Sequence, residues 1–377
     1  MLFRLYFLGC LLALCPAARA EETFRFPEGK HGKGELKYRN GLPVLIAQGT
    51  PEEIGEQIGV LAIKPAAVKM KALVKDGIQK RVGSVGYPLL VTACTGLFKK
   101  FPPEYRKEVE AMARGGGIDL EVLVVANTIA DVVHLGGCSV LVVEPARSET
   151  GGSLLGRNMD TEALAGLVEA SVVIVRRPAG KHAFVSVTFP GMLTCGSEMN
   201  DAGLVLAAND VWRTKDGSPK LDPRGTPLLV AARQLMEDCA SRAEARRLLR
   251  DFKATTTGCA ILADREGGAV YELTPKNIIV RPAEDGICTC TNHFCSPELA
   301  VPAEERCWRY DKLEEYRKRP KLDVPDVAKA LDEVSQGKAT LHSMIFEPKT
   351  LRAHMAVGDG TAKKRPRKTL ECRELFR

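Results

Sequence analysis

The sequence has little of what marks a nucleic-acid-binding protein. Aromatic residues make up 6% of its 377 residues, and the formal charge is a modest +7. Much of the positive charge falls in two short runs, 317–319 and 363–368, with no aromatic side chain among the basic ones. Nucleic-acid sites usually combine a basic stripe with aromatic side chains on which bases stack. We interpret the basic runs as solvated segments and expect no nucleic-acid partner.

The motifs of several common catalytic and cofactor sites are also absent. The chain has no Gly-x-Ser-x-Gly, no phosphate-binding P-loop and no dinucleotide fingerprint, which excludes the sites that these motifs form. We therefore expect no cofactor. The histidines outside any pairing pattern are expected to be structural: His31, His134, His182, His342 and His354.

No long apolar run follows residue 20, so no later segment is expected to cross a membrane. Residues 1–20 have the pattern of a signal peptide, with Arg4, an apolar stretch Leu5–Leu14 and a cleavage site at Ala18–Ala20. The apolar stretch is too short to remain as a membrane span. We expect cleavage after Ala20 and export to the periplasm or the outside of the cell.

The cysteine count argues against a disulfide framework. Twelve cysteines are present, and Cys10 and Cys15 would leave with the signal peptide. Ten then remain, or nine if one is a nucleophile, and an odd number cannot pair completely. One or two disulfides stay compatible with an oxidising compartment. A lipid anchor on Cys10 or Cys15 stays an alternative, although neither has the small neighbours typical of such a site.

Four possible zinc ligands lie close together in Cys288-x-Cys290-x-x-His293-x-Cys295. The residue types suit zinc. Alternation along a strand, however, places residues 288 and 290 on one face and His293 on the other, and no second ligand pair follows after a loop. We expect no metal here and interpret the segment as a strand that leads into Asn292.

The most informative stretch begins at Cys138. Two apolar runs, 140–143 and 154–155, are separated by a turn-rich segment, which predicts a hairpin of two strands. Such a hairpin places Cys138 near Arg157 and Asp160. A cysteine that faces a cation and a carboxylate is a candidate nucleophile, because the cation favours the thiolate. The alternative is a packed structural cysteine, which is the commoner case.

This stretch resembles a known family. Cys138-Ser139 followed by Gly156-Arg157-Asn158-x-Asp160 resembles the nucleophile hairpin of the N-terminal-nucleophile (Ntn) hydrolases. It is most similar to the acyl-CoA:6-aminopenicillanate acyltransferase family, the C45 peptidases, with bile-salt hydrolases and acid ceramidase as more distant relatives. The resemblance implies that the chain cuts itself just before Cys138. The new α-amino group would then serve as the base for the thiol, and Arg157 and Asp160 would orient the amine and the substrate.

Two later segments extend the resemblance to an oxyanion hole. Thr291-Asn292-His293-Phe294 resembles the family's Asn-His segment, in which the asparagine lines the oxyanion hole. The segment Gly196–Leu204 matches a family hairpin that closes with an asparagine, here Asn209, which corresponds to a second oxyanion position in the bile-salt hydrolases. An amide donates a hydrogen bond without charge, which suits an oxygen that becomes negative only in the transition state. The alternative is that both are turn asparagines.

A third segment, Arg306-Cys-Trp-Arg309-Tyr310-x-x-Leu313, resembles the family's Ser-x-x-Arg-Tyr-x-x-Leu helix. The resemblance implies that Arg309 is an electrostatic partner near the nucleophile. Arg306 stands where the family has serine, so the chain departs from the pattern at that position. The alternative is that Arg309 is a surface arginine on an amphipathic helix.

The order of helix and strand patterns fits an α+β layer fold in one globular unit. The resemblance makes this a four-layer αββα sandwich of two antiparallel sheets between helix layers. After the signal peptide at 1–20, it implies a helical leader at 21–137 and a catalytic part at 138–377, as two fragments of one domain. Helices are expected over 50–62, 68–79, 102–114, 119–133, 227–236, 241–252 and 324–334, and strands over 42–46, 170–175, 183–188, 204–208, 257–263, 269–272, 289–293, 343–346 and 351–357.

Taken together, these features predict an exported, self-processing Ntn amidohydrolase or acyltransferase. Cys138 would attack the carbonyl of a small N-acyl amide, form a thioester and pass the acyl group to water or an amine. The alternative is an exported binding or structural protein that keeps the fold without catalysis. The identity of the substrate does not follow from the fold.

Overall fold

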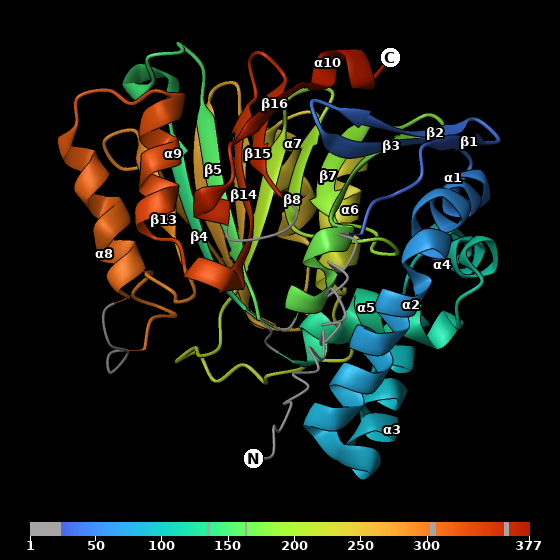
Figure 1. The fold of residues 1–377 in the computed structure, drawn as a ribbon. Coiled ribbons are helices and arrows are strands. Elements are labelled where there is room, and N and C mark those ends of the chain that lie inside the picture. Colours follow the sequence, from blue (N-terminus) through green and yellow to red (C-terminus); the bar gives the residue numbers. More distant parts are fainter. Residues whose placement is uncertain (1–23, 134–135, 163, 302–306, 358–361) are drawn as a thin grey trace, which may run out of the picture.

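The computed structural model describes residues 24–133, 136–162, 164–301, 307–357 and 362–377. The predicted signal peptide at 1–20, His134 and Arg306 lie outside the described residues. Two β-sheets stack at the centre, with helices on both outer sides (Figure 1). The predicted four-layer αββα sandwich is confirmed.

The larger sheet has ten strands in the order β1-β2-β3-β6-β7-β8-β9-β10-β11-β12. Every pair in it is antiparallel except β3 with β6, which is parallel, so the sheet is not purely antiparallel as predicted. Its strands are β1 (Gly29–His31), β2 (Gly34–Arg39), β3 (Leu42–Gly49), β6 (Val172–Pro178), β7 (Phe184–Thr188), β8 (Ser197–Asn200), β9 (Val205–Asp210), β10 (Gly258–Asp264), β11 (Gly267–Leu273) and β12 (Ile278–Pro282).

The smaller sheet has six strands in the order β13-β4-β5-β14-β15-β16, and all its pairs are antiparallel. The predicted nucleophile hairpin forms its centre as β4 and β5. The strands are β4 (Gly137–Val143), β5 (Leu154–Asp160), β13 (Ile287–Cys290), β14 (Thr340–Glu347), β15 (Arg352–Ala356) and β16 (Lys368–Glu371).

Alternation along β4 explains the layers. Val140 and Val142 point into the core between the sheets, while Leu141 and Val143 pack with the helices on the outer side. Because side chains alternate along a strand, Cys138 shares the inner face with Val140. The outer helices of this sheet are α8 (Trp308–Glu314) and α9 (Val324–Glu333), which Figure 1 shows side by side.

The opposite outer layer contains the leader helices together with α6 (Leu228–Asp238) and α7 (Arg242–Arg250). The leader is not wholly helical, because β1, β2 and β3 form one edge of the larger sheet. The helices α4 and α5 lie where they were predicted. The leader helices are α1 (Pro51–Ile58), α2 (Lys64–Lys71), α3 (Ile78–Phe98), α4 (Pro103–Gly116) and α5 (Leu120–Val132).

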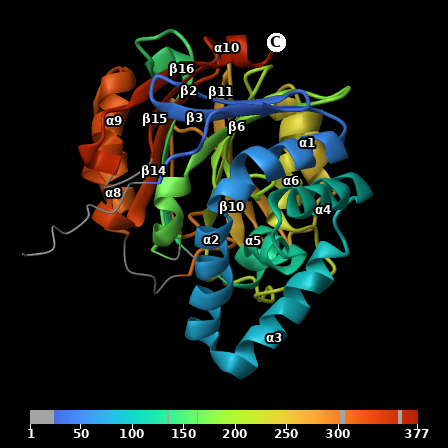
Figure 2. The same cartoon turned by 45° about the vertical axis from the view of Figure 1, so that its right-hand side comes forward.

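The predicted gap between the first two helices is absent. Single π-turns, Gly59–Ile63 and Ala72–Gly77, join α1, α2 and α3 into one helical path. Pro65 lies in the first turn of α2, just after the first π-turn. A proline has no backbone N–H to donate, and it is tolerated there because the hydrogen-bond pattern of the α-helix is already interrupted. The predicted helix end at residue 79 is a few residues early: the backbone leaves helical geometry at Gly83 (φ 77°, ψ 170°), and a second helical stretch follows within α3 as far as Phe98. In Figure 2 the lower part of α2 and α3 extends away from the sheets as an arm.

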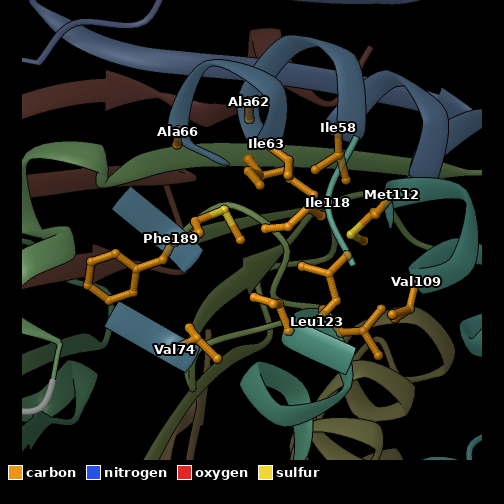
Figure 3. Packing of buried hydrophobic residues seen from close by; sticks show 14 of the residues in the cluster. Ile58, Ala62, Ile63, Ala66, Val74, Val109, Met112, Ile118, Leu123 and Phe189 are labelled. Atoms are coloured by element: carbon orange, nitrogen blue, oxygen red, sulfur yellow. The ribbon is translucent and has the colours of Figure 1, made fainter. Parts of the chain in front are cut away.

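Apolar side chains from the leader pack together with side chains of the later part of the chain. Figure 3 shows Ile58, Ile63, Met112 and Leu123 in one cluster of buried side chains that also includes Phe189, which follows β7. All five side chains are buried. The leader and the catalytic part therefore share one hydrophobic core, which would hold two fragments together after a cut between them. Within the described ranges, no helix combines the length and apolar character needed to span a bilayer.

A buried ion network also joins the two parts. Glu108 on α4 accepts hydrogen bonds from Arg176 on β6 at 3.0 Å and from Arg233 on α6 at 2.7 Å. Arg233 bonds Glu237 as well, at 2.6 Å. All four side chains are at most 3% exposed. Although burial alone raises the pKa of Glu108, its two arginine partners hold that pKa below the usual range. Glu108 is therefore a charged link between the leader and the rest.

We expect Glu108→Gln to lower the free energy of unfolding by about 3–5 kcal/mol, because it leaves two buried guanidinium groups with incomplete partners. Glu371→Gln breaks the exposed pair Arg352–Glu371 (47% and 50% exposed) and should cost about 1 kcal/mol or less. Chemical denaturation of both variants measures the difference. Equal losses in the two would contradict a structural role for the buried network.

Candidate active site

The nucleophile candidate lies at the end of the β4–β5 hairpin. Cys138 is opposite Met159, Gly137 is opposite Asp160, and Val140 is opposite Arg157. Because paired residues point to the same face of a sheet, Arg157 and Met159 on β5 share the inner face with Cys138, and Asp160 faces the outer side. The structure therefore brings the predicted Cys138, Arg157 and Asp160 to one strand end but separates their side chains onto two faces.

Arg157 contacts the thiol directly. Its Nη2 lies 3.4 Å from Cys138 Sγ and donates to the carbonyl of Ala208 at 2.6 Å. Its Nη1 donates to the carbonyls of Cys195 and Gly196 and to the hydroxyl of Ser197. The guanidinium thus ties the nucleophile strand to the hairpin that begins at Gly196.

Burial raises the pKa of the Cys138 thiol, and the Arg157 charge opposes this only in part. The thiol is 7% exposed. In the uncut chain the nucleophile is therefore a neutral thiol. It follows that the cation alone does not supply the thiolate, and attack needs a base.

Asp160 is held on the outer face by a set of donors. Its Oδ2 accepts from Gln336 Nε2 at 3.0 Å and lies 3.8 Å from Arg309 Nη1, and its Oδ1 accepts from the Thr340 hydroxyl. Burial raises the pKa of Asp160, and these donors together with the arginines oppose that shift. The carboxylate therefore lies one residue from the nucleophile's partner on β5, and its charge contributes to the raised pKa of the Cys138 thiol.

Arg309 lies at the nucleophile, as its motif predicted. Its Nη1 donates to the Cys138 carbonyl at 2.6 Å and to Ser139 Oγ at 3.0 Å, and its Nη2 donates to Asn292 Oδ1 at 2.9 Å. The side chain is 8% exposed, which excludes the alternative of a free surface arginine. Arg309 therefore fixes the backbone of the nucleophile and the position of Asn292 together.

Asn292 contacts the bond that would be cut. Its Oδ1 accepts from the Cys138 backbone N–H at 2.8 Å. Its Nδ2 donates to the carbonyls of Asp210 at 2.8 Å and Gly136 at 3.4 Å. In the uncut chain the amide donor is thus occupied by backbone, and one of its two acceptors belongs to the leader. Removal of that leader carbonyl would release donor capacity beside Cys138.

Asn209 lies on β9 at the wall of the same site. Its Nδ2 donates to the carbonyls of Cys290 at 3.3 Å and Thr291 at 3.1 Å. These bonds tie β9 to the segment that carries Asn292. Both predicted oxyanion residues are thus brought together, but neither amide is free in this state, so their role as oxyanion donors stays a prediction.

The two glycines before the nucleophile are in close contact with their surroundings. A Cβ on Gly136 would lie 2.5 Å from the backbone carbonyl oxygen of Asp160, and a Cβ on Gly137 would lie 2.7 Å from Gln336 Nε2. The first contact is with backbone and cannot relax by side-chain rotation. Gly136 and Gly137 therefore allow the leader to approach β5 closely and leave the carbonyl before Cys138 unshielded.

Cys138 opens on a large, mostly apolar cavity of about 730 Å³. Arg157, Asp160 and Asn209 also line it, while the apolar wall comes from the leader helices, from the loop after β7 and from α6 and α7. Ala130, Ile129, Phe189 and Leu235 are examples of that wall. The volume is in the range of small-molecule sites, and a few polar groups converge at one end of it.

Within the described residues, no three metal-binding side chains converge. Cys288 and Cys290 are buried in the core between the sheets, whereas His293 lies 3.7 Å from Cys295 on another side. The predicted strand ends earlier than expected, because β13 stops at Cys290. The alternation argument therefore covers Cys288 and Cys290 but not His293, which lies beyond the strand. The ten cysteines that the structure describes all carry free thiols.

Sequence reasoning missed Gln336 and Thr340, the two direct partners of Asp160. Both follow α9 at the start of β14, about 180 residues after Asp160 in the chain. Neither stands in a motif. Glu198 was missed as well: it is fully buried, accepts from the Cys195 backbone N–H at 2.8 Å, and has a pKa raised by burial. The strand predicted at 343–346 begins three residues too late to include Thr340, because β14 starts at that residue.

Comparisons with known proteins identify the family. A family model described as Acyl-coenzyme A:6-aminopenicillanic acid acyl-transferase matches residues 147–362, more than half of the chain. The match begins after Cys138. An uncharacterised protein of Archaeoglobus fulgidus is 23% identical over 336 residues, which cover 73% of this chain and 54% of that protein. The chain thus spans about half the length of that relative.

Three solved structures show low similarity. A conjugated bile acid hydrolase mutant from Clostridium perfringens has a TM-score of 0.46 at 12% identity, and covers 63% of this chain and 93% of its own. A Caenorhabditis elegans N-acylethanolamine-hydrolyzing acid amidase ortholog has a TM-score of 0.43 at 16% sequence identity. The match covers 56% of this chain and 93% of that one. Penicillin V acylase from Agrobacterium tumefaciens has a TM-score of 0.40 at 15% sequence identity. The match covers 59% of this chain and 84% of that one. On the strength of the family match, the chain belongs to the acyl-coenzyme A:6-aminopenicillanic acid acyl-transferase family.

Proposed function

We propose that this protein is a cysteine Ntn hydrolase or acyltransferase that cleaves or transfers the acyl group of a small N-acyl amide. The observation that carries the proposal is Cys138, whose thiol lies at the polar end of an apolar cavity and 3.4 Å from Arg157. Family membership supports the reaction class. Arg309 and Asn292 hold the backbone of the same residue.

The proposed reaction begins with self-cleavage between Gly137 and Cys138. The new α-amino group has a reference pKa of about 7.7–8.0, so it is a suitable base at neutral pH. It takes the thiol proton, the thiolate attacks the substrate carbonyl, and an oxyanion forms. Asn292 and Asn209 donate to that oxygen. The amine leaves with a proton, and the thioester passes its acyl group to water or to another amine.

The cavity supports a large apolar acyl group. Away from the polar end at Cys138, the cavity wall is formed largely by apolar side chains of the leader helices and of α6. A buried CH₂ stabilises a complex by about 0.8 kcal/mol. We therefore infer that specificity for the acyl group comes from hydrophobic contact and that the leader contributes to the specificity after processing.

A variant that fills the cavity tests this inference. Ala130 on α5 lines the cavity, so Ala130→Leu should lower kcat/KM for long-chain acyl amides by about tenfold while sparing short-chain ones, because only the long chains reach it. Val68→Leu, at a leader position that is 81% exposed, is the matched control. A panel of N-acyl amides of increasing chain length gives the measurement. Equal losses at all chain lengths would contradict the assignment of the cavity.

The same panel separates catalysis from the alternative of a binding protein that keeps the fold. An enzyme releases amine from at least one member with turnover that depends on Cys138. A binding protein retains the ligand unchanged. The expected export of the chain is a further part of the proposal and is tested by N-terminal sequencing of secreted protein, which should begin at Glu21.

A further inference from the structure

A second group of thiols lies beside the active site and has no part in the proposed reaction. His293, which follows Asn292, lies with its Nε2 3.7 Å from Cys295 Sγ. The thiol of Cys307 interacts electrostatically with the same imidazole and with the hydroxyl of Thr291. Both cysteines are partly exposed, in contrast to the buried Cys138. One imidazole thus lies between two thiols that are far apart in the chain.

We propose that Cys307 and Cys295 form a redox-active thiol pair that reacts with small-molecule disulfides, with His293 as the base that activates Cys307. The geometry supports this, because a histidine in hydrogen-bond contact with a cysteine can take its proton and leave a thiolate. The segments that carry the two cysteines are adjacent, since the rings of His293 and Tyr310 contact each other. A thiolate with a second thiol next to it is the usual arrangement of a reversible thiol switch.

The charges around the pair favour the thiolate on Cys307. Burial by itself raises the pKa of the Cys307 thiol, but the hydrogen bond from His293, the hydroxyl of Thr291 and the charge of Arg309 lower it to about 6. The same contacts with Cys295 and Cys307 raise the pKa of His293 to about 10. Thr291 Oγ1 lies 3.0 Å from His293 Nδ1. The rings of Tyr310 and His293 pack edge to face, with their centroids 5.0 Å apart. These neighbours fix the orientation of the ring.

The reaction with a disulfide such as oxidised glutathione balances in two exchanges. The Cys307 thiolate attacks one sulfur of the reagent and releases one glutathione thiolate, which leaves a mixed disulfide on Cys307. Cys295 then loses its proton and attacks the Cys307 sulfur, which releases the second glutathione thiolate. The protein loses two electrons and two protons, and the reagent is reduced to two thiols.

The resulting bond would join the two segments that meet at the nucleophile. Asn292 lies three residues before Cys295, and Arg309 lies two residues after Cys307. Arg309 donates to Asn292 at 2.9 Å. A disulfide between Cys295 and Cys307 would therefore link covalently the two segments that carry Asn292 and Arg309. The expected export of the chain would expose the pair to an oxidising compartment.

Peptide mass mapping of the whole wild-type chain at pH 6.5, after treatment with oxidised glutathione, tests the proposal. We expect a linked Cys295–Cys307 peptide pair that a reductant separates. Cys295→Ser should instead retain glutathione on Cys307, and Cys307→Ser should give no link. His293→Gln should slow the reaction by about tenfold or more, since the thiolate fraction falls while each thiolate becomes a better nucleophile.

Two controls keep the outcome decisive. Cys239, whose pKa is raised to about 11 by burial, should react far more slowly in the same sample. A wild-type rate profile should show half-maximal labelling of Cys307 near pH 6, which needs no variant to fold. Labelling of Cys307 no faster than Cys239, or a link that forms equally fast in His293→Gln, would overturn the proposal. Neither readout depends on the acyl reaction, so this test and that of the proposed function can fail separately.

Discussion

We expect Cys138→Ala to remain one uncut chain and to lose turnover by about ten-thousandfold or more. Removal of a nucleophile leaves only the binding groups and the oxyanion donors, and losses of this size follow in other covalent enzymes. The substitution removes the Sγ that Arg157 contacts and leaves the backbone contacts of residue 138 to Asn292 and Arg309 in place. Turnover on the N-acyl amide panel and denaturing gel electrophoresis measure the two effects.

Cys138→Ser is the conservative companion. Serine keeps a nucleophilic atom at the position of the Cys138 sulfur, but a hydroxyl is a weaker nucleophile than a thiol. The variant should therefore cleave itself slowly and show weak turnover. Cys372→Ala controls for the loss of a fully buried cysteine that belongs to the core between the sheets and does not line the cavity. It should keep processing and activity. Undiminished turnover in Cys138→Ala would remove this residue from the mechanism.

The second large effect is expected at Asn292. Asn292→Ala should lower turnover by about a hundredfold or more, since loss of one oxyanion donor costs that much in other enzymes. In the uncut chain its Nδ2 donates to the carbonyl of Gly136 at 3.4 Å, which belongs to the leader. Cleavage after Gly137 frees this part of the leader to move, and the amide can then turn to the substrate oxygen.

Asn292→Asp separates the donor role from the structural role. It keeps an acceptor at the position that contacts the Cys138 N–H at 2.8 Å and Arg309 at 2.9 Å, but it removes the amide donor. We expect processed, folded protein with a loss of kcat similar to that of Asn292→Ala. Asn277→Ala, which removes a contact to Asp216 far along the chain, is the control. Normal turnover in processed Asn292→Asp would show that the amide does not stabilise the oxyanion.

Those parts of the fold that depend on local pattern could be predicted from sequence. The hairpin of β4 and β5 is one example, because an apolar run, a turn and a second apolar run specify strand pairing and register. α4 is another, because Pro103 marks the start of that helix and Gly117 its end. The path through α1, α2 and α3 could not be predicted, because π-turns depend on packing against the other helices rather than on a local motif.

The site shows the same division. Cys138, Arg157, Asn292 and Arg309 stand in motifs, and the structure brings their side chains into contact. Gln336 stands in none, and it reaches Asp160 only because β14 pairs with β5 across 176 residues of chain. Alternation along β5 did place Arg157 and Asp160 on opposite faces. That separation follows directly from the spacing of three residues along a strand.

The charge on the nucleophile depended on burial, which sequence does not give. The Cys138–Arg157 pair predicts a stabilised thiolate, but burial raises the pKa of the thiol despite that contact. The thiol therefore needs a base. The structure describes five histidines: His31, His182, His293, His342 and His354. Each forms its hydrogen bonds or ion pairs with groups other than the Cys138 thiol. This places the burden of activation on the α-amino group that self-cleavage would create.

N-terminal sequencing of active wild-type protein, together with its intact mass, tests this account most directly. The account predicts two tightly associated chains, residues 21–137 and 138–377, with Cys138 as the first residue of the second chain. Glu108 and the shared core should hold the two chains together in native buffer. Fully active enzyme that consists of a single uncut chain would contradict the free-amine mechanism.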